Sequence, residues 1–210
     1  FNWVDYPLEL YGAYGGLLGN TPLICGGKSF GHYIDECYSL NGETSKFVTK
    51  MSVKRFGAAS IVLNETILWI TGGYNVNGLL ASSEYIRLSG SSPGPDLPMA
   101  LASHAMIAIN TTHSMVIGGR SSDELDLTFY FDHGNQQWID GPRLIQARLR
   151  HAVGIVNDQV TMTNLVPIQE EGSSVSCAVK RAIYIINAQK NIVYAVVQKV
   201  NPIGWLVNIK

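Results

Sequence analysis

The sequence has few charged residues and no excess of either sign. Lys and Arg number 15 and Asp and Glu 16, so charged residues make up 15% of the chain and the net charge is −1. An average globular chain has roughly 25%. A nucleic-acid-binding protein would show a basic excess, and a disordered chain would combine high charge with low hydrophobicity. The composition therefore argues against both classes and predicts no nucleic-acid partner.

Long apolar segments are also missing. No uncharged apolar run reaches the roughly 18 residues that a transmembrane helix needs, so the sequence predicts no membrane span. What the chain does have is apolar and small residues: 46% are hydrophobic and 21 of the 210 residues are Gly. This length and composition suit one folded domain, or two small ones, with a buried core.

Three kinds of sequence marker recur with a period of about 46 residues. The Gly-Gly pairs are Gly26 and Gly27, Gly72 and Gly73, and Gly118 and Gly119, 46 residues apart. An Asn closes a run of small and β-branched residues at Asn64, Asn110 and Asn157, at intervals of 46 and 47. An aromatic residue follows each Gly pair at Tyr38, Tyr85 and Tyr130, at intervals of 47 and 45. Markers that share one period indicate an internal repeat.

Each repeat has the pattern of short strands. Runs of β-branched, aromatic and small residues, bounded by Gly, Asn and Pro, are typical of strands. The expected strands of the second unit are 58–63, 67–71 and 84–88, and the third unit adds 137–139. Four antiparallel strands in about 46 residues is the content of one propeller blade. Paired glycines suit a crowded strand end where φ is positive.

The order of these markers resembles the kelch repeat. The third unit matches best, with Gly118, Gly119, Tyr130 and Trp138 followed by Arg143. The first unit has Phe47 in place of the tryptophan, and the second has no aromatic residue there. The resemblance covers about residues 11–163. It implies an all-β fold: an incomplete or small kelch-type β-propeller built from four-stranded antiparallel blades of about 46 residues.

The pattern stops near residue 164, which divides the chain into kelch-type blades over 1–163 and a second segment over 164–210. A fourth Gly pair would fall at 164, where Asn164 and Leu165 stand. Beyond it, 182–186 and 192–197 flank a turn like two strands. The segment is either a divergent fourth blade or an unrelated tail. About four and a half units make a short ring, whose open sheet edges would allow self-association.

The cysteines and two sequons bear on the cellular compartment. Cys25 and Cys37 end and begin neighbouring antiparallel strands, so they are expected to form a disulfide; the alternative is two reduced core cysteines. Cys177 is left over. The sequons at Asn64 and Asn110 lie in equivalent turns and are candidate glycosylation sites. Together these features predict an extracellular or secretory-pathway protein, with a cytoplasmic location as the alternative.

The sequence shows no pattern of catalytic chemistry. The five histidines lack the close spacing of zinc ligands, and no nucleophile elbow or phosphate loop is present. We therefore expect no enzyme activity, no catalytic residue, no metal site and no cofactor. The kelch resemblance adds one enzymatic alternative, a fragment of a copper radical oxidase, but no motif here matches the cross-linked Cys–Tyr site of those enzymes.

Recognition remains as the function. In an up-and-down blade, the loops 28–36, 74–83 and 120–126 share one face with the connections 49–55, 95–103 and 142–150. Tyr and Arg, which are enriched at binding hot spots, occur in these segments. The candidate binding residues are Phe30, His32, Tyr33, Tyr74, Arg120, Arg143 and Arg148. Arg55 and Arg150, which precede strands, are expected instead to pack across neighbouring blades.

Two functional hypotheses follow. The first is a non-enzymatic, extracellular kelch-type module that binds a protein or a glycan through these loops. The second is a fragment of an intracellular kelch substrate receptor or adaptor that lacks its partner domains. The redox state of Cys25 and Cys37 separates the two, because disulfides persist in oxidising compartments.

Overall fold

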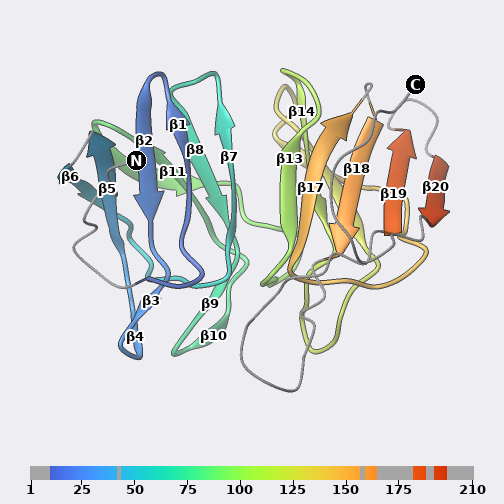
Figure 1. Cartoon of the computed structure of the whole chain (residues 1–210), viewed down its shortest axis with the longest axis horizontal. Helices are drawn as coiled ribbons and strands as arrows, with labels where there is room; N and C mark the ends of the chain where they lie inside the picture. Colours follow the sequence, from blue (N-terminus) through green and yellow to red (C-terminus); the bar gives the residue numbers. More distant parts are fainter. Residues whose placement is uncertain (1–9, 42–43, 157–158, 165–181, 188–191, 198–210) are drawn as a thin grey trace, which may run out of the picture.

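The computed structural model describes residues 10–41, 44–156, 159–164, 182–187 and 192–197. These residues form four antiparallel four-stranded sheets, and the described part of the chain contains no helix (Figure 1). The expected all-β class and the four-stranded antiparallel units are thereby confirmed. Asn157 and Cys177 lie outside the described residues.

Each sheet takes its strands in chain order. Sheet 1 consists of β1 (Tyr14–Leu18), β2 (Thr21–Cys25), β5 (Glu36–Asn41) and β6 (Thr44–Lys50). Sheet 2 consists of β7 (Ala59–Leu63), β8 (Ile67–Thr71), β11 (Ser83–Arg87) and β12 (Gly90–Gly94). Sheet 3 consists of β13 (Ala105–Ala108), β14 (His113–Ile117), β15 (Thr128–Asp132) and β16 (Gln137–Asp140). Sheet 4 consists of β17 (His151–Val156), β18 (Gln159–Asn164), β19 (Ala182–Asn187) and β20 (Ile192–Val197).

The four sheets stand side by side, with the first strand of each next to the first strand of the following one. Contacts join β1 to β7, β7 to β13 and β13 to β17. Among the described strands, no contact of comparable extent returns from β17 to β1, so the row of sheets does not close. The sheet order β17-β18-β19-β20 crosses residue 164, but the interpretation of 164–210 as a divergent blade stays a prediction.

Apolar side chains fill the spaces between neighbouring sheets. Leu23 of sheet 1 belongs to the same buried cluster as Leu68 and Ile70 of sheet 2. Sheets 2 and 3 meet through Trp69 and Phe131, whose ring centroids are 5.0 Å apart. A third cluster joins sheets 3 and 4. Because both faces of sheets 2 and 3 are covered, their second strands, β8 and β14, are buried on both sides instead of alternating with exposed positions, whereas β11 also buries the polar Ser83 and Glu84.

The glycine pairs have the same backbone conformation in all three units. The first glycine of each pair, at 26, 72 and 118, has φ of 61°, 61° and 56°, and the second, at 27, 73 and 119, has φ of 94°, 93° and 94°. These left-handed conformations strain any residue with a Cβ. The second glycine also donates an equivalent hydrogen bond in all three units, from Gly27 to the carbonyl of Arg55, from Gly73 to Leu101, and from Gly119 to Arg148.

Gly72→Val should destabilise the fold by roughly 2–4 kcal/mol, since it combines positive φ with overpacking. A Cβ on Gly72 would lie 2.5 Å from the Leu101 carbonyl oxygen, which is backbone and cannot move freely. Chemical denaturation would measure the loss. Gly154→Val is the control, because a Cβ there meets nothing within 4 Å and φ is not positive. An unchanged midpoint for Gly72→Val would contradict the role assigned to the pairs.

Gly94, which lies in a stretch rich in Ser, Pro and Gly, is unsuitable as a control. It ends β12, and an added Cβ would lie 2.5 Å from Ser83 Oγ and 3.2 Å from Trp69 Nε1. Side chains of β8 and β11, which lie in the same sheet but are distant in the sequence, therefore crowd this position.

The aromatic marker of the first unit does not occupy the same place as the other two. Tyr85 pairs with Trp69 and Tyr130 with Met115, which are equivalent positions 46 residues apart. Tyr38 instead pairs with Ile24, one residue out of step. A shift of one residue moves a side chain to the opposite face of a sheet, so grouping Tyr38 with Tyr85 and Tyr130 was wrong. The third-unit marker Trp138 packs against Trp69 of the preceding sheet, with centroids 5.9 Å apart.

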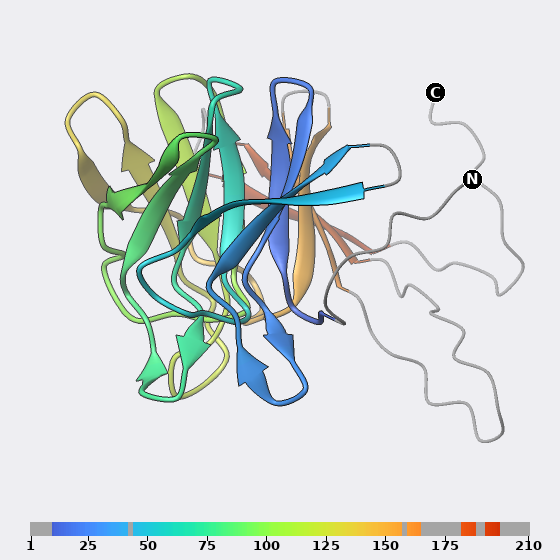
Figure 2. The same cartoon turned by 90° about the vertical axis from the view of Figure 1, so that its left-hand side faces the viewer.

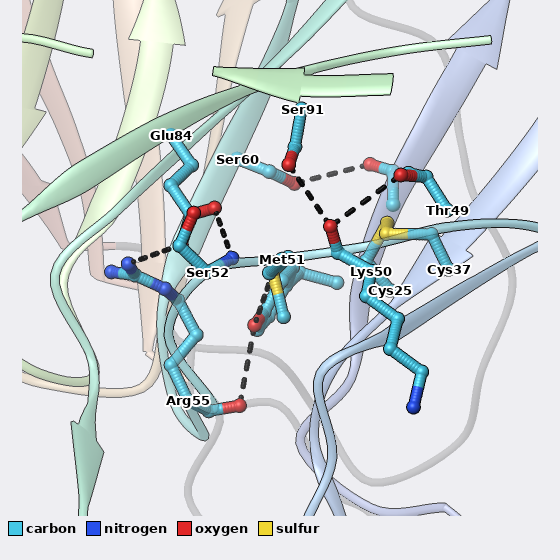
Figure 3. The surroundings of a disulfide bond; sticks show 12 residues. Cys25, Cys37, Thr49, Lys50, Met51, Ser52, Arg55, Ser60, Glu84 and Ser91 are labelled. Atoms are coloured by element: carbon cyan, nitrogen blue, oxygen red, sulfur yellow. Dashed lines mark hydrogen bonds and ion pairs between the residues drawn. A yellow bond between two sulfur atoms is a disulfide. The ribbon is translucent and has the colours of Figure 1, made fainter. Parts of the chain in front are cut away.

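The expected disulfide between Cys25 and Cys37 is present (Figure 3). The two residues are direct partners in the β2–β5 register, and both are fully buried. Replacing both with Ala should cost roughly 2–3 kcal/mol, chiefly because a short closed loop no longer restricts the unfolded chain. Denaturation of the wild type with and without reductant should show a loss of similar size. Stability that is insensitive to reductant, with both thiols free by peptide mapping, would contradict the bond.

Candidate functional site

The connections between strands separate into two ends of the molecule. The hairpin turns between the first and second strands, and between the third and fourth, gather at one end, which we call the turn end. The longer connections gather at the opposite end, which we call the loop end: residues 26–35, 51–58, 72–82, 95–104, 118–127 and 141–150 (Figure 1). Candidate binding residues from separate sheets therefore share one end, as the up-and-down order predicts.

Two short hairpins project from the loop end. The first pairs β3 (Lys28–Ser29) with β4 (His32–Tyr33), and the second pairs β9 (Tyr74–Asn75) with β10 (Gly78–Leu79) (Figures 1 and 2). Tyr33 of the first hairpin contacts Tyr74 of the second edge to face, with centroids 6.0 Å apart. This ring contact joins the bases of the two hairpins, while their tips project separately.

A row of four aromatic rings crosses the bases of these hairpins. Tyr11 meets Phe56 at 5.4 Å, Phe56 meets Tyr74 at 5.1 Å, and Tyr74 meets Tyr33 at 6.0 Å, all edge to face. Lys28 Nζ lies 5.0 Å from the centre of the Tyr33 ring, within cation–π range. We call these five residues the aromatic row. Tyr11 is 52% exposed and the other rings are half-buried, so the row is partly open to solvent.

Sequence reasoning found Tyr33 and Tyr74 but missed Tyr11 and Phe56. The residue that follows each Gly pair forms a β-bridge to the residue three positions before the first strand of its own sheet: Tyr11 to Lys28, Phe56 to Tyr74, and Ala102 to Arg120. The near-46-residue spacing of Tyr11, Phe56 and Ala102 could have revealed this position. It was overlooked because none of the markers used to define the repeat falls on it.

The three candidate arginines have different environments. Arg120 is exposed and follows Gly119, at the position equivalent to Lys28 and Tyr74. Arg143 is exposed and pairs with Asp126 at 2.8 Å. Arg148 is only 2% exposed, so its placement on the recognition surface was wrong. Its backbone carbonyl accepts the Gly119 hydrogen bond, which holds this segment against the sheets.

Arg55 has the structural role expected of it, whereas Arg150 does not. The Arg55 guanidinium is fully buried and pairs with Glu84 at 2.9 Å (Figure 3). It also donates to the carbonyls of Gly72 and Ser82, both at 2.8 Å. Arg150 is exposed and has φ of 51°. Arg150 is therefore a surface residue of the loop end and not a packing residue between sheets.

The histidines also fall into exposed and buried residues. His32 is exposed beside the tip of the first hairpin. His104 and His151 begin the equivalent segments of sheets 3 and 4 and are buried. Burial lowers the pKa of His104 to about 3 and that of His151 to about 4, with smaller contributions from His151 and Arg148 respectively. Both are consequently neutral core residues at physiological pH.

Asn64 and Asn110 occupy equivalent turns at the turn end, and both are exposed. Asn64 has φ of 48° in the β7–β8 turn. Asn110 Oδ1 accepts hydrogen bonds from Thr112 N and Thr112 Oγ1, each at 2.8 Å. The strands β8 and β14 separate these turns from the loop end, so a group attached there would not cover the aromatic row.

The described residues contain neither a metal-ion cluster nor a membrane-spanning helix. No group of three or more His, Cys, Asp or Glu side chains is arranged to hold a metal ion in this part of the chain. Within the same residues, no helix is long and apolar enough to cross a membrane.

No protein-family model matches the chain, and no curated protein matches it.

Proposed function

We propose that this chain is a kelch-type β-propeller module that binds a protein or a glycan through its loop end. The repeat geometry supports the architecture: three glycine pairs share their backbone conformations, and successive four-stranded sheets adjoin through their first strands in chain order. No catalytic arrangement is part of the proposal. Sheet edges left open by an incomplete ring would allow a second copy to associate.

The aromatic row is the observation that carries the binding function. It joins rings from two sheets into one partly exposed strip on loops held by a rigid scaffold, which is where binding residues concentrate. Arg120 extends the strip toward sheet 3 with an exposed cation. Aromatic and arginine side chains dominate the energetics of interfaces. Aromatic rings bury much area with few rotatable bonds, and the planar guanidinium of arginine offers several donors in a fixed geometry.

An extracellular or secretory-pathway location fits the disulfide, since such bonds persist in oxidising compartments. We propose that Asn64 and Asn110 carry N-linked glycans in that location. Both lie at the turn end, so their glycans would leave the loop end accessible.

The proposal is tested with a glycan microarray and a phage-displayed peptide library as probes. Tyr74→Ala and Arg120→Ala should each weaken binding of the recovered ligands by roughly ten-fold or more, as for hot-spot residues. Asn64→Gln and Asn110→Gln, at the turn end, should leave binding unchanged. Ligands whose binding is lost in the turn-end variants and kept in the loop-end variants would contradict the assignment, as would the absence of any ligand in both screens.

A further inference from the structure

Two apolar side chains at the loop end are exposed far more than the rest. Phe30 is 79% exposed and Val76 is 82% exposed. Each stands at the tip of one of the two projecting hairpins, β3–β4 and β9–β10 (Figure 2). Among the other described large apolar residues, the highest value is 63%, at Ile145 in a connection of the same end. The tips therefore extend apolar groups beyond the surface formed by the aromatic row.

Phe30 is also held in an unfavourable backbone conformation. Its φ is 45°, in the left-handed region that bulky residues avoid, and Gly31 follows with φ of 86°. Two successive positive φ values in a two-residue hairpin turn favour Asn-Gly, because Asn tolerates the left-handed region and Phe does not. Since the ring is exposed, no packing within the molecule offsets this strain. Strain of this kind is typical of residues that serve a contact outside the chain.

The surroundings of the tips indicate the kind of contact. Lys28 and His32 flank Phe30 in the first hairpin, so one apolar side chain projects between cationic or polar neighbours. A protein interface has a contiguous apolar core with a polar rim, and two separate prongs do not form one. Single apolar side chains that reach past polar and cationic neighbours match the boundary between lipid headgroups and acyl chains.

The second hairpin has the same pattern with different residues. Val76 projects between Asn75 and the exposed Asn77. The Asn75 amide is bonded within the protein, since its Nδ2 donates to the Lys54 carbonyl at 3.1 Å and its Oδ1 accepts from the Asn77 N–H at 2.8 Å. The Asn77 side chain is therefore the polar group next to Val76 that faces solvent. In the connection before sheet 4, exposed Ile145 lies two residues after the exposed Arg143. Apolar prongs with polar flanks thus recur across the loop end.

We propose that the two hairpin tips insert into the surface of a phospholipid bilayer, with Phe30 and Val76 at the acyl boundary and Lys28 at the level of the phosphates. This goes beyond the protein or glycan recognition proposed above, because it concerns the tips and a lipid surface. Exposed Asp123 and Glu124 on the neighbouring loop oppose an anionic membrane. Insertion of apolar groups is therefore the main attraction, and its dependence on salt is modest.

The test is sedimentation of the full chain with phosphatidylcholine vesicles, with and without added phosphatidylserine. Two side chains bury less apolar area than a myristoyl chain, so the association constant should lie below about 10⁴ M⁻¹. Phe30→Asn should lower vesicle binding by about five-fold or more while raising the denaturation midpoint, since Asn suits the left-handed turn. Val76→Asn should lower binding without that gain. Leu88→Asn is the control, because Leu88 is 51% exposed at the turn end.

Phe30→Asn is expected to weaken vesicle binding and to raise stability at the same time, and a merely structural role of Phe30 would not produce this combination. The proposal fails if the wild-type chain binds neither vesicle, or if Phe30→Asn and Val76→Asn bind as well as the wild type. If the wild type binds no lipid and these variants lose a peptide or glycan ligand, the tips belong to the recognition surface instead. Arg120→Ala should impair that recognition but leave binding to phosphatidylcholine unchanged, so the two proposals can fail separately.

Discussion

Glu84→Gln is expected to destabilise the fold by about 3–5 kcal/mol, the cost of leaving a buried charge without its partner. The Glu84 side chain is 3% exposed and the Arg55 side chain is fully buried, with 2.9 Å between Oε1 and Nη2. Glu84 also accepts from the backbone N–H groups of Ser52, at 2.7 Å, and Val53, at 3.1 Å. The carboxylate therefore fixes the connection between sheets 1 and 2 in addition to neutralising Arg55.

Chemical denaturation of Glu84→Gln, Arg55→Met and the double variant would measure the coupling. The double variant should lose less than the sum of the single variants, because it removes both charges together. Arg143→Gln is a matched control: its pair with Asp126 is as short, at 2.8 Å, but its side chain is 70% exposed. Water screens such a pair, so the loss should stay below about 1 kcal/mol. Equal losses in Glu84→Gln and Arg143→Gln would contradict the assigned role of burial.

Acidification from pH 8 to pH 5 is expected to remove about 4 kcal/mol of stability through His104 and His151 together. Burial lowers the pKa of these side chains to about 3 and about 4, below the ordinary value of 6.5. Between the folded and the ordinary pKa, the unfolded chain binds more protons than the folded one. Stability is therefore full above about pH 6.5 and falls as the pH drops toward the folded pKa values.

The combined variant His104→Gln, His151→Gln should have a much flatter profile of unfolding free energy against pH over this range, although its stability at pH 8 is lower. A smaller slope should remain, because burial also lowers the pKa of His133. Asp132 and Glu36 have lowered pKa values as well, but protonation of these carboxylates reduces the stability of the fold only at more acidic pH. His32→Gln, at an exposed position, is the control. An unchanged profile in the combined variant would refute the role of the buried histidines.

The repeat was predictable because its cause is local. A left-handed strand end admits Gly and strains other residues, so Gly72 and Gly118 mark equivalent backbone sites whatever surrounds them. The strand expected at Ile67–Thr71 was found with the same bounds, since its apolar run and flanking turn residues specify it. The disulfide followed from the ends of two adjacent strands.

Side-chain placement was harder to predict, and the errors have one physical origin. Tyr38 lies one residue out of register with Tyr85, and one residue reverses the face of a strand. Arg148 and Arg150 are two residues apart in one connection, yet one is buried and the other exposed. Which of them enters the space between sheets depends on neighbouring residues that are far away in the sequence.

The sequence by itself determined the all-β class, the period and the glycine sites and favoured the disulfide, because each depends on backbone conformation or on contacts between adjacent strands. Only the tertiary structure decided which side chains reach the surface. The aromatic row draws Tyr11, Phe56 and Tyr74 from segments 45 and 18 residues apart. The Arg55–Glu84 pair likewise spans 29 residues. Such contacts form when sheets pack against one another, and no local pattern records which residues will meet.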